Sequence, residues 1–197
     1  MEHDSSKKDL IIEAAYEVFK RFGYEKTAMN DIARAAKMGK GSVYYYFESK
    51  EDIFIAALEQ EVQNGLNKIV SSLNRINDPI ERLKHALIKP LSIISEAPLL
   101  MQVWNDENHF LRKLKEFKKE KHCKLKELLR SCVVYAQERG VLIEEFDVET
   151  FLEFIVKWFY MGDDEVTFEL TPQVVEGILK DFELMTDYML YGILKRS

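Results

Sequence analysis

Residues 27–54, TAMNDIARAAKMGKGSVYYYFESKEDIF, decide how the whole chain is interpreted. Apolar residues recur at helical spacing before a turn at 37–39, and a second helix is expected over about 40–46. Val43 and Phe47 stand four residues apart and give this second helix an inner face. Two short helices joined by a tight turn that contains glycine form a helix-turn-helix unit.

Three consecutive tyrosines, Tyr44 to Tyr46, lie within the second of these helices. Neighbours in sequence cannot all point into one core, so at least one ring must face outward. An outward tyrosine can offer its ring edge to a thymine methyl group and its hydroxyl to a phosphate or a base edge. Nearby lysines favour a nucleic-acid partner; the alternative is that the rings cover a small core and bind nothing.

The segment resembles the DNA-binding part of the tetracycline-repressor (TetR) family of bacterial transcription regulators. The resemblance covers residues 10–55 and rests on a dozen positions at fixed spacing: Thr27, Asp31, Ile32, Ala33, Gly41, Ser42, Val43, Tyr44, Tyr46, Phe47, Lys50 and Glu51. It implies an all-α fold with a DNA-binding domain over residues 1–50 and a ligand-binding and dimerisation domain over residues 51–197. The DNA contacts that it implies, with those of the outer helix face, are Thr27, Lys37, Lys40, Gly41, Ser42, Tyr44, Tyr45, Tyr46 and Lys50.

Two positions depart from the family pattern. Lys37 stands in the turn where the family usually has glycine, and Gly39 stands where a serine usually caps the recognition helix. Glycine caps a helix almost as well as serine, within a few tenths of a kcal/mol, but it has no hydroxyl to donate to a phosphate. We expect Lys37 to supply a replacement contact, and Gly41 to let the start of the helix approach DNA closely.

The remaining sequence predicts further helices and few loops, because only eight Gly and four Pro occur. The expected ranges are 8–22, ending at Gly23, then 49–74, 78–94, 99–104, 108–139, 148–162 and 172–195. Side chains that can cap helices precede four of the helices: Thr27, Ser49, Asp78 and Thr171. Pro90 lies inside one helical pattern and is expected to kink it.

Composition limits the classes of function. The chain of 197 residues has a net charge of −6, but residues 1–50 carry nine Lys/Arg against eight Asp/Glu, and the rest carry nineteen against twenty-six. Only the first quarter can therefore approach phosphate without general repulsion. The histidines and the two cysteines show no metal or disulfide pattern, and no segment is apolar enough to span a membrane. We expect a cytoplasmic protein that is not an enzyme and needs no metal or cofactor.

The resemblance also implies partners for the C-terminal part. An apolar pocket for a small hydrophobic or aromatic effector would involve His85, Met101, Trp104, Phe110, Phe154 and Trp158. The family forms homodimers through its last two helices, which here implies an interface at Phe151, Ile155, Val175, Ile178, Phe182, Met185 and Met189. The alternative is that both sets of residues only form the internal core of one chain, because apolar stripes at helical spacing most often belong to a core.

Two hypotheses about function follow. The first is a homodimeric, sequence-specific regulator of transcription that is released from double-stranded operator DNA by a small hydrophobic molecule. The second is a DNA-binding architectural or adaptor protein of the same fold, which is controlled by a protein partner and has no small-molecule input.

Overall fold

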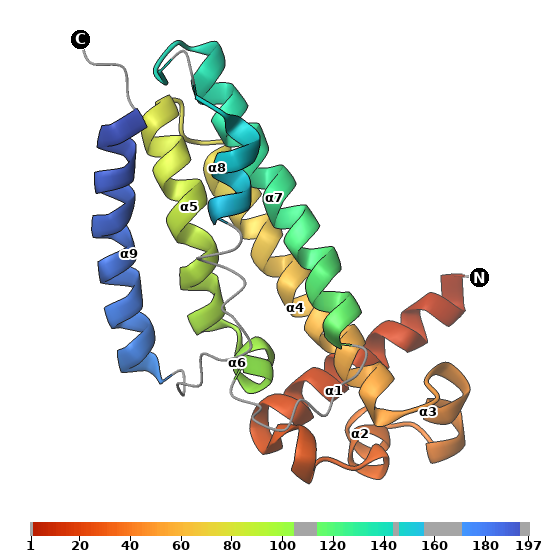
Figure 1. Ribbon diagram of the computed structural model, residues 1–197. Helices are drawn as coiled ribbons and strands as arrows, with labels where there is room; N and C mark the ends of the chain where they lie inside the picture. Colours follow the sequence, from red (N-terminus) through yellow and green to blue (C-terminus); the bar gives the residue numbers. More distant parts are fainter. Residues whose placement is uncertain (1, 105–113, 144–145, 156–170, 194–197) are drawn as a thin grey trace. The chain divides into compact units, whose positions relative to one another are not determined.

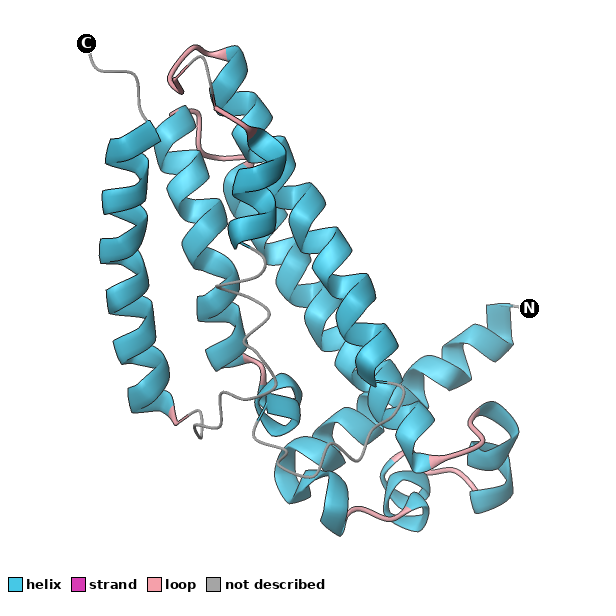
Figure 2. Ribbon diagram, viewed as in Figure 1, coloured by secondary structure: helices cyan, strands magenta, loops and turns pink. Residues whose placement is uncertain are grey.

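The structure, a computed structural model, describes residues 2–104, 114–143, 146–155 and 171–193. Helices joined by loops make up these ranges (Figures 1 and 2), so the prediction of an all-α fold is confirmed. The helices are α1 (Glu2–Lys26), α2 (Met29–Ala35), α3 (Lys40–Tyr46), α4 (Lys50–Leu73), α5 (Pro79–Glu96), α6 (Pro98–Trp104), α7 (Leu114–Glu138), α8 (Val148–Ile155) and α9 (Pro172–Ile193).

The chain divides into two compact units. The first contains residues 1–64 and 97–114, and the second contains residues 65–96 and 115–197. The first unit thus holds not only the predicted DNA-binding domain but also the start of α4 and all of α6. The predicted domain boundary at residue 50 does not coincide with this division, because α4 continues without a break from one unit into the other.

The core of the first unit forms where α1 packs against α2 and α6. Phe19 of α1 and Phe54 of α4 are buried, and their rings meet edge to face with centroids 5.0 Å apart. Tyr24 completes this aromatic cluster at 5.1 Å from Phe54. Gly23 adopts φ 79° and interrupts the helical conformation of α1, as its predicted role at the end of the helix requires.

Three of the four predicted caps are confirmed. The Asp52 amide donates to the Ser49 hydroxyl (3.1 Å), the Ile80 and Glu81 amides donate to Asp78 (2.9 Å each), and the Val174 amide donates to Thr171 (3.2 Å). The fourth was wrong. Ala28 is the N-cap of α2, and its amide donates to the Asp31 carboxylate (3.0 Å), whereas the Thr27 hydroxyl donates to the Gly23 carbonyl (2.7 Å).

Two side chains hold α6 in place within the first unit through hydrogen bonds to backbone groups. The Gln102 amide group donates to the Phe19 carbonyl (3.0 Å), and its oxygen accepts from the Tyr24 amide (3.2 Å). These backbone groups lie on either side of the Gly23 break, so Gln102 bridges it. Glu61 of α4 accepts from the amides of Leu99 (3.3 Å) and Leu100 (2.9 Å), which satisfies the first turn of α6.

Glu61 should make the stability of the protein depend on pH. Burial raises the pKa of its carboxyl group, although the amides of α6, the Tyr16 hydroxyl and Lys20 favour the charged form. The folded chain therefore holds this proton more tightly than the unfolded chain does, and stability is lost as the pH rises from the unfolded pKa through the folded pKa. We expect the free energy of unfolding of the wild type, relative to Glu61→Gln, to fall as the pH rises above the ordinary glutamate pKa of about 4.3 and through the raised pKa of the folded state.

Urea unfolding at a series of pH values measures this difference. Glu13→Gln, which removes an exposed carboxylate of α1, is the matched control and should leave the slope of the wild type unchanged. A wild-type stability that rises with pH relative to Glu61→Gln would show that the hydrogen bonds to α6 outweigh the cost of burial.

The second unit has its own apolar core, to which α5 and α9 contribute where they pack together. Leu87, Leu129 and Leu152, from α5, α7 and α8, are completely buried there. Gly65 of α4 allows close packing, because a Cβ atom at this position would lie 2.7 Å from Cγ2 of Ile93. Pro90 does lie inside α5, as predicted. The kink expected from it stays a prediction.

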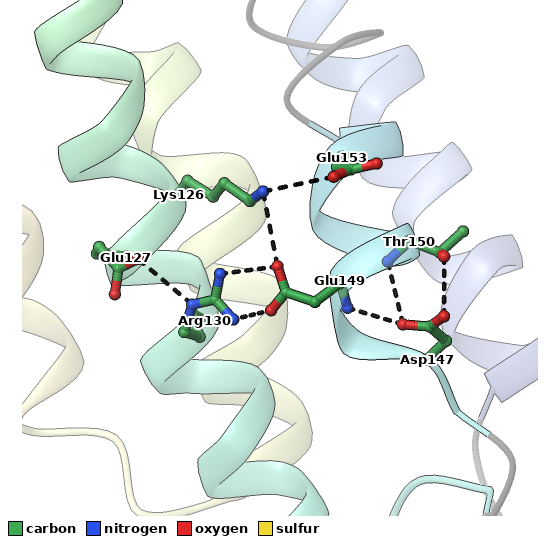
Figure 3. A network of polar contacts seen from close by, with 7 residues as sticks. All are labelled: Lys126, Glu127, Arg130, Asp147, Glu149, Thr150 and Glu153. Atoms are coloured by element: carbon green, nitrogen blue, oxygen red, sulfur yellow. Dashed lines mark hydrogen bonds and ion pairs between the residues drawn. The ribbon is translucent and has the colours of Figure 1, made fainter.

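A polar network joins α7 to α8 on the surface of the second unit (Figure 3). Arg130 forms an ion pair with Glu149, and Lys126 lies 3.7 Å from Glu149 and 3.9 Å from Glu153. The Asp147 carboxylate accepts from the amides of Glu149 and Thr150 and so caps α8. Because the carboxylates of Glu149 and Glu153 remain more than half exposed, we assign the network a role in orienting α8, with little effect on stability.

Candidate nucleic-acid interface

The helix-turn-helix consists of α2, the turn at 36–39 and α3, which spans the range predicted for it. Ile32 and Ala33 of α2 and Val43 of α3 are buried, and so is Phe47 just beyond α3. This inner face determines the rotation of α3 about its axis, and hence which of its side chains face away from the core. Gly39 is the N-cap of α3, without a side-chain hydrogen bond.

The outward residues of α3 include two of the three tyrosines. Tyr45 is 76% exposed and Tyr44 is 45% exposed, whereas Tyr46 is only partly exposed. The ring of Tyr45 meets that of Tyr46 edge to face at 5.0 Å, and the ammonium of Lys40 lies 5.7 Å from the Tyr44 ring centroid. The interpretation that at least one ring faces outward is confirmed, and two aromatic surfaces stand beside a cation on a short exposed helix.

Gly41 has no structural explanation within the fold. A Cβ atom at this position would meet nothing within 4 Å. Glycine inside a helix costs roughly 0.5–1 kcal/mol relative to alanine, so the fold itself would be better served by alanine. The missing side chain leaves the backbone of α3 open to close approach from outside.

The backbone conformation of Lys37 also lowers the stability of the fold. The residue has φ 56°, and it is the only non-glycine residue with positive φ among the described residues. A left-handed conformation costs a residue with a side chain roughly 1–2 kcal/mol, and glycine adopts it without this cost. This strained residue lies in the turn, next to the exposed face of α3. Strained backbone conformations are concentrated at functional sites, so the strain marks Lys37 as a candidate functional residue.

Replacing Lys37 by glycine should therefore separate stability from binding. We expect Lys37→Gly to raise the free energy of unfolding by up to about 1 kcal/mol, because relief of strain exceeds the entropy that glycine adds to the unfolded chain. We expect the same variant to bind DNA more weakly, by a similar factor for every sequence. Urea unfolding and binding titrations measure the two effects. Lys40→Gly is the control: it also removes a lysine, but it should lower stability, since Lys40 is helical.

Two predicted DNA contacts already have partners within the chain. Thr27 is only 4% exposed and its hydroxyl donates to the Gly23 carbonyl, so little of its surface remains for a phosphate. The ammonium of Lys50 donates to the Tyr24 carbonyl (2.8 Å) and lies 4.0 Å from the centroid of the Tyr24 ring. Both side chains support the end of α1, and DNA contacts by them stay predictions.

An open groove runs beside the turn and α3. Its volume is about 590 Å³, and it is lined by Lys7, Lys37, Met38, Gly39, Gly41, Ser42, Tyr45 and Tyr46. Five of these are predicted DNA-binding residues, so the structure brings them together. Lys7 of α1 was missed by sequence reasoning, because the sequence does not show that the first turns of α1 lie beside α3. The pair Lys7-Lys8 in a region of balanced charge was the only available signal.

These features define the class of the protein. A helix-turn-helix with a buried inner face, exposed tyrosines and a glycine open to close approach is the geometry of a DNA-binding domain whose second helix enters the major groove. Among the described residues, no group of three or more His, Cys, Asp or Glu could hold a metal ion. None of the described helices is long and apolar enough to cross a membrane.

Comparisons with known proteins agree with this class. Residues 11–57 match the family model described as "Bacterial regulatory proteins, tetR family". The regulator YhgD of Bacillus subtilis is 46% identical over 86 residues, which are 42% of this chain and 45% of YhgD. The probable acrEF/envCD operon repressor of Escherichia coli is 25% identical over 192 residues, 87% of this chain and 84% of the repressor. This chain therefore spans less than half of YhgD but most of the repressor.

The whole fold is also found in solved structures. FadR of Bacillus subtilis, a transcriptional regulator solved in complex with stearoyl-CoA, superposes with a TM-score of 0.58 over 92% of this chain and 95% of FadR, at 22% identity. At this identity the likeness concerns the fold. The match over residues 11–57, with the likeness to the operon repressor along most of the chain, identifies this protein as a member of the TetR family of transcription regulators.

The predicted effector residues fall in different parts of the structure. Met101 and Trp104 belong to α6 in the first unit, whereas His85 and Phe154 belong to the second. His85 is partly buried beside the Ser72 hydroxyl (2.7 Å), and burial and Lys89 lower the pKa of its imidazole. Phe154 is 46% exposed. Phe110 and Trp158 lie outside the described residues.

The predicted dimer residues divide between core and surface. Ile155 (0% exposed) and Phe182 (4%) lie in the core of the second unit, and Met189 packs against that core. We correct the assignment of Ile155 and Phe182, because side chains buried within one chain present no surface to a second copy. Ile178 and Phe151 are partly buried, and Met185 is 48% exposed. The side chain of Val175 is not among those that the structure describes.

Proposed function

We propose that this protein is a homodimeric repressor that binds a specific operator sequence in double-stranded DNA and is released by a small hydrophobic or aromatic molecule. The observation that carries the DNA-binding part is the outer face of α3 and its turn. Gly41 and Lys37 both cost stability, Gly41 because the space around it is open and the fold has no need of glycine there, and Lys37 because its backbone is left-handed. Residues of this kind are retained where a partner needs them, and both line the groove beside the exposed Tyr45.

Base recognition is assigned to Tyr44 and Tyr45, and positioning on the phosphates to the lysines and Ser42. Base contacts specify the sequence, whereas phosphate contacts set the register of the protein on the duplex. A single α3 covers only a few base pairs, so two copies are needed for a site that is specific within a genome. The relative whose name describes an operon repressor, matched over most of both chains, supports repression as the outcome.

The dimer interface is assigned to an exposed stripe on α9. Its apolar members Val174, Gly177, Leu184 and Met185 are exposed, and with Asp181 they recur every three or four residues, the spacing of helices that pack side by side. A Cβ atom at Gly177 would meet nothing within 4 Å, so a second helix can approach closely there. Asp181 is the exposed charge within this stripe.

Control by an effector is proposed from the family fold. Stearoyl-CoA bound to FadR of Bacillus subtilis is an amphiphile with a long apolar chain, in line with the apolar effector proposed for this chain. The effector must bind the DNA-incompetent conformation about 10⁴-fold more tightly to move occupancy from 99:1 to 1:99. We keep His85, Met101, Trp104 and Phe154 as proposed contacts, together with Phe110 and Trp158.

Selection of bound duplexes from a random pool by the full chain tests this function. The proposal expects enrichment of one site with two related halves. Stearoyl-CoA and a panel of aromatic acids are then added to the complex while tryptophan fluorescence and DNA occupancy are followed together. Quenching and release at the same concentration support an effector-controlled repressor. Saturated quenching with unchanged DNA affinity would instead support the adaptor hypothesis.

A further inference from the structure

The groove beside α3 is basic in a protein that is acidic overall. Its eight lining residues include two lysines, Lys7 and Lys37, and no Asp or Glu, although the chain carries a net charge of −6. Neither lysine forms an ion pair with any other residue that the structure describes. The groove therefore offers two ammonium groups, tyrosine and serine hydroxyls and bare backbone at glycine, which is the composition expected of a surface that receives a phosphodiester.

The position of Lys7 is set by the packing of α1. Ile11, one turn further along the helix, is completely buried, and the ammonium of Lys8 lies 5.4 Å from the centroid of the Phe47 ring. Phe47 directly follows α3. The contact between Lys8 and Phe47 places the start of α1 beside the end of the recognition helix, and Lys7, which is exposed, reaches the groove from α1.

We propose that Lys7 and Lys37 together bind the phosphate backbone of the DNA strand that runs along this groove, so that α1 forms part of the DNA interface. This inference rests on the proposed function and adds a positioning residue to it. Lys37 approaches from the turn, in a conformation held at a cost in backbone strain, and Lys7 approaches from a different helix. Two cations from separate elements fix the rotation of the first unit on the duplex better than one can.

The salt dependence of DNA binding tests the proposal. Each phosphate that a lysine neutralises adds about −0.9 to the slope of log Kobs against log salt concentration. We expect Lys7→Ala to make the slope shallower by about 0.9, Lys7→Ala with Lys37→Ala by about twice that, and Lys7→Arg to keep the wild-type slope. The order of preference among DNA sequences should not change. Circular dichroism and thermal unfolding verify that the variants fold.

The matched control is Lys68→Ala, which removes the same charge from an exposed position in the second unit. A slope for Lys7→Ala equal to that of Lys68→Ala would overturn the role of Lys7, while DNA binding by the wild type would still support the proposed function. A wild type that enriches no duplex would overturn the proposed function and this inference with it.

Inorganic phosphate separates a DNA backbone site from a site for a free anion. We expect phosphate to displace the duplex no better than chloride of equal ionic strength does. Displacement by phosphate at concentrations well below that of the salt, lost in Lys7→Ala, would show that the groove binds a free anion and would contradict the assignment to the DNA strand.

Discussion

Replacement of Tyr45 by alanine is expected to relax the choice of DNA sequence by about 1–3 kcal/mol, the value of one good base contact. Tyr45 is 76% exposed, so the stability of the folded protein should change by no more than about 0.5 kcal/mol. A loss of discrimination without a loss of stability would be specific to base recognition. Binding to the selected duplex and to duplexes with single base changes measures it.

Two further variants separate the contributions of the Tyr45 ring. Tyr45→Phe keeps the apolar edge and removes the hydroxyl, so it reports whether the contact is to a thymine methyl group or to a polar atom. Phe22→Ala is the control, because Phe22 is a 50% exposed aromatic residue of α1 that does not line the groove. Unchanged site preference in both Tyr45→Ala and Tyr44→Ala would contradict the assignment of base recognition to these tyrosines.

Leu184→Asp or Met185→Asp is expected to convert a dimer into monomers. Each residue is about half exposed, so a carboxylate there is solvated in the monomer but desolvated at the proposed interface. A symmetric interface contains every substitution twice, and we expect a loss of at least about 2 kcal/mol of association free energy. Sedimentation at micromolar concentration measures the change, and affinity for a site with two halves should fall with it.

Two other substitutions serve as comparisons. Gln137→Asp adds the same charge at an exposed position of α7, a different helix of the second unit, and should leave the dimer intact. Phe182→Asp, which the sequence alone suggests as the test, is not diagnostic, because Phe182 lies in the core and its truncation alone would cost about 3–5 kcal/mol of stability. A wild type that sediments as a monomer would contradict the assignment of a dimer interface to the exposed stripe on α9.

The sequence predicted local structure well where a side chain acts on its own backbone or where spacing is unambiguous. Val43 and Phe47 gave the inner face of α3 and therefore its outer face, and Ser49, Asp78 and Thr171 cap the helices that they precede. Thr27 failed as a cap because the N-cap of α2 is the next residue, Ala28, and the Thr27 hydroxyl donates instead to the Gly23 carbonyl in the last turn of α1.

Contacts between distant segments were the main limit. The apolar spacing of α9 predicted a seam, but spacing does not reveal whether a seam meets another helix of the same chain or a second copy. Phe182 proved to face the chain's own core and Leu184 the surface. The role of Gln102, which joins α6 to both sides of the Gly23 break, and the place of Lys7 in the groove depend on contacts that no local pattern encodes.

The ratio of affinities for the selected duplex and for a scrambled duplex of the same composition tests the central claim most directly. At about 0.15 M salt we predict that the full chain binds the selected duplex at least about 10³-fold more tightly. We also predict two copies per duplex, with half-sites centred about 34–36 Å apart or a multiple of this. Equal affinity for the two duplexes would contradict the account, because it would show that α3 and its tyrosines read no sequence.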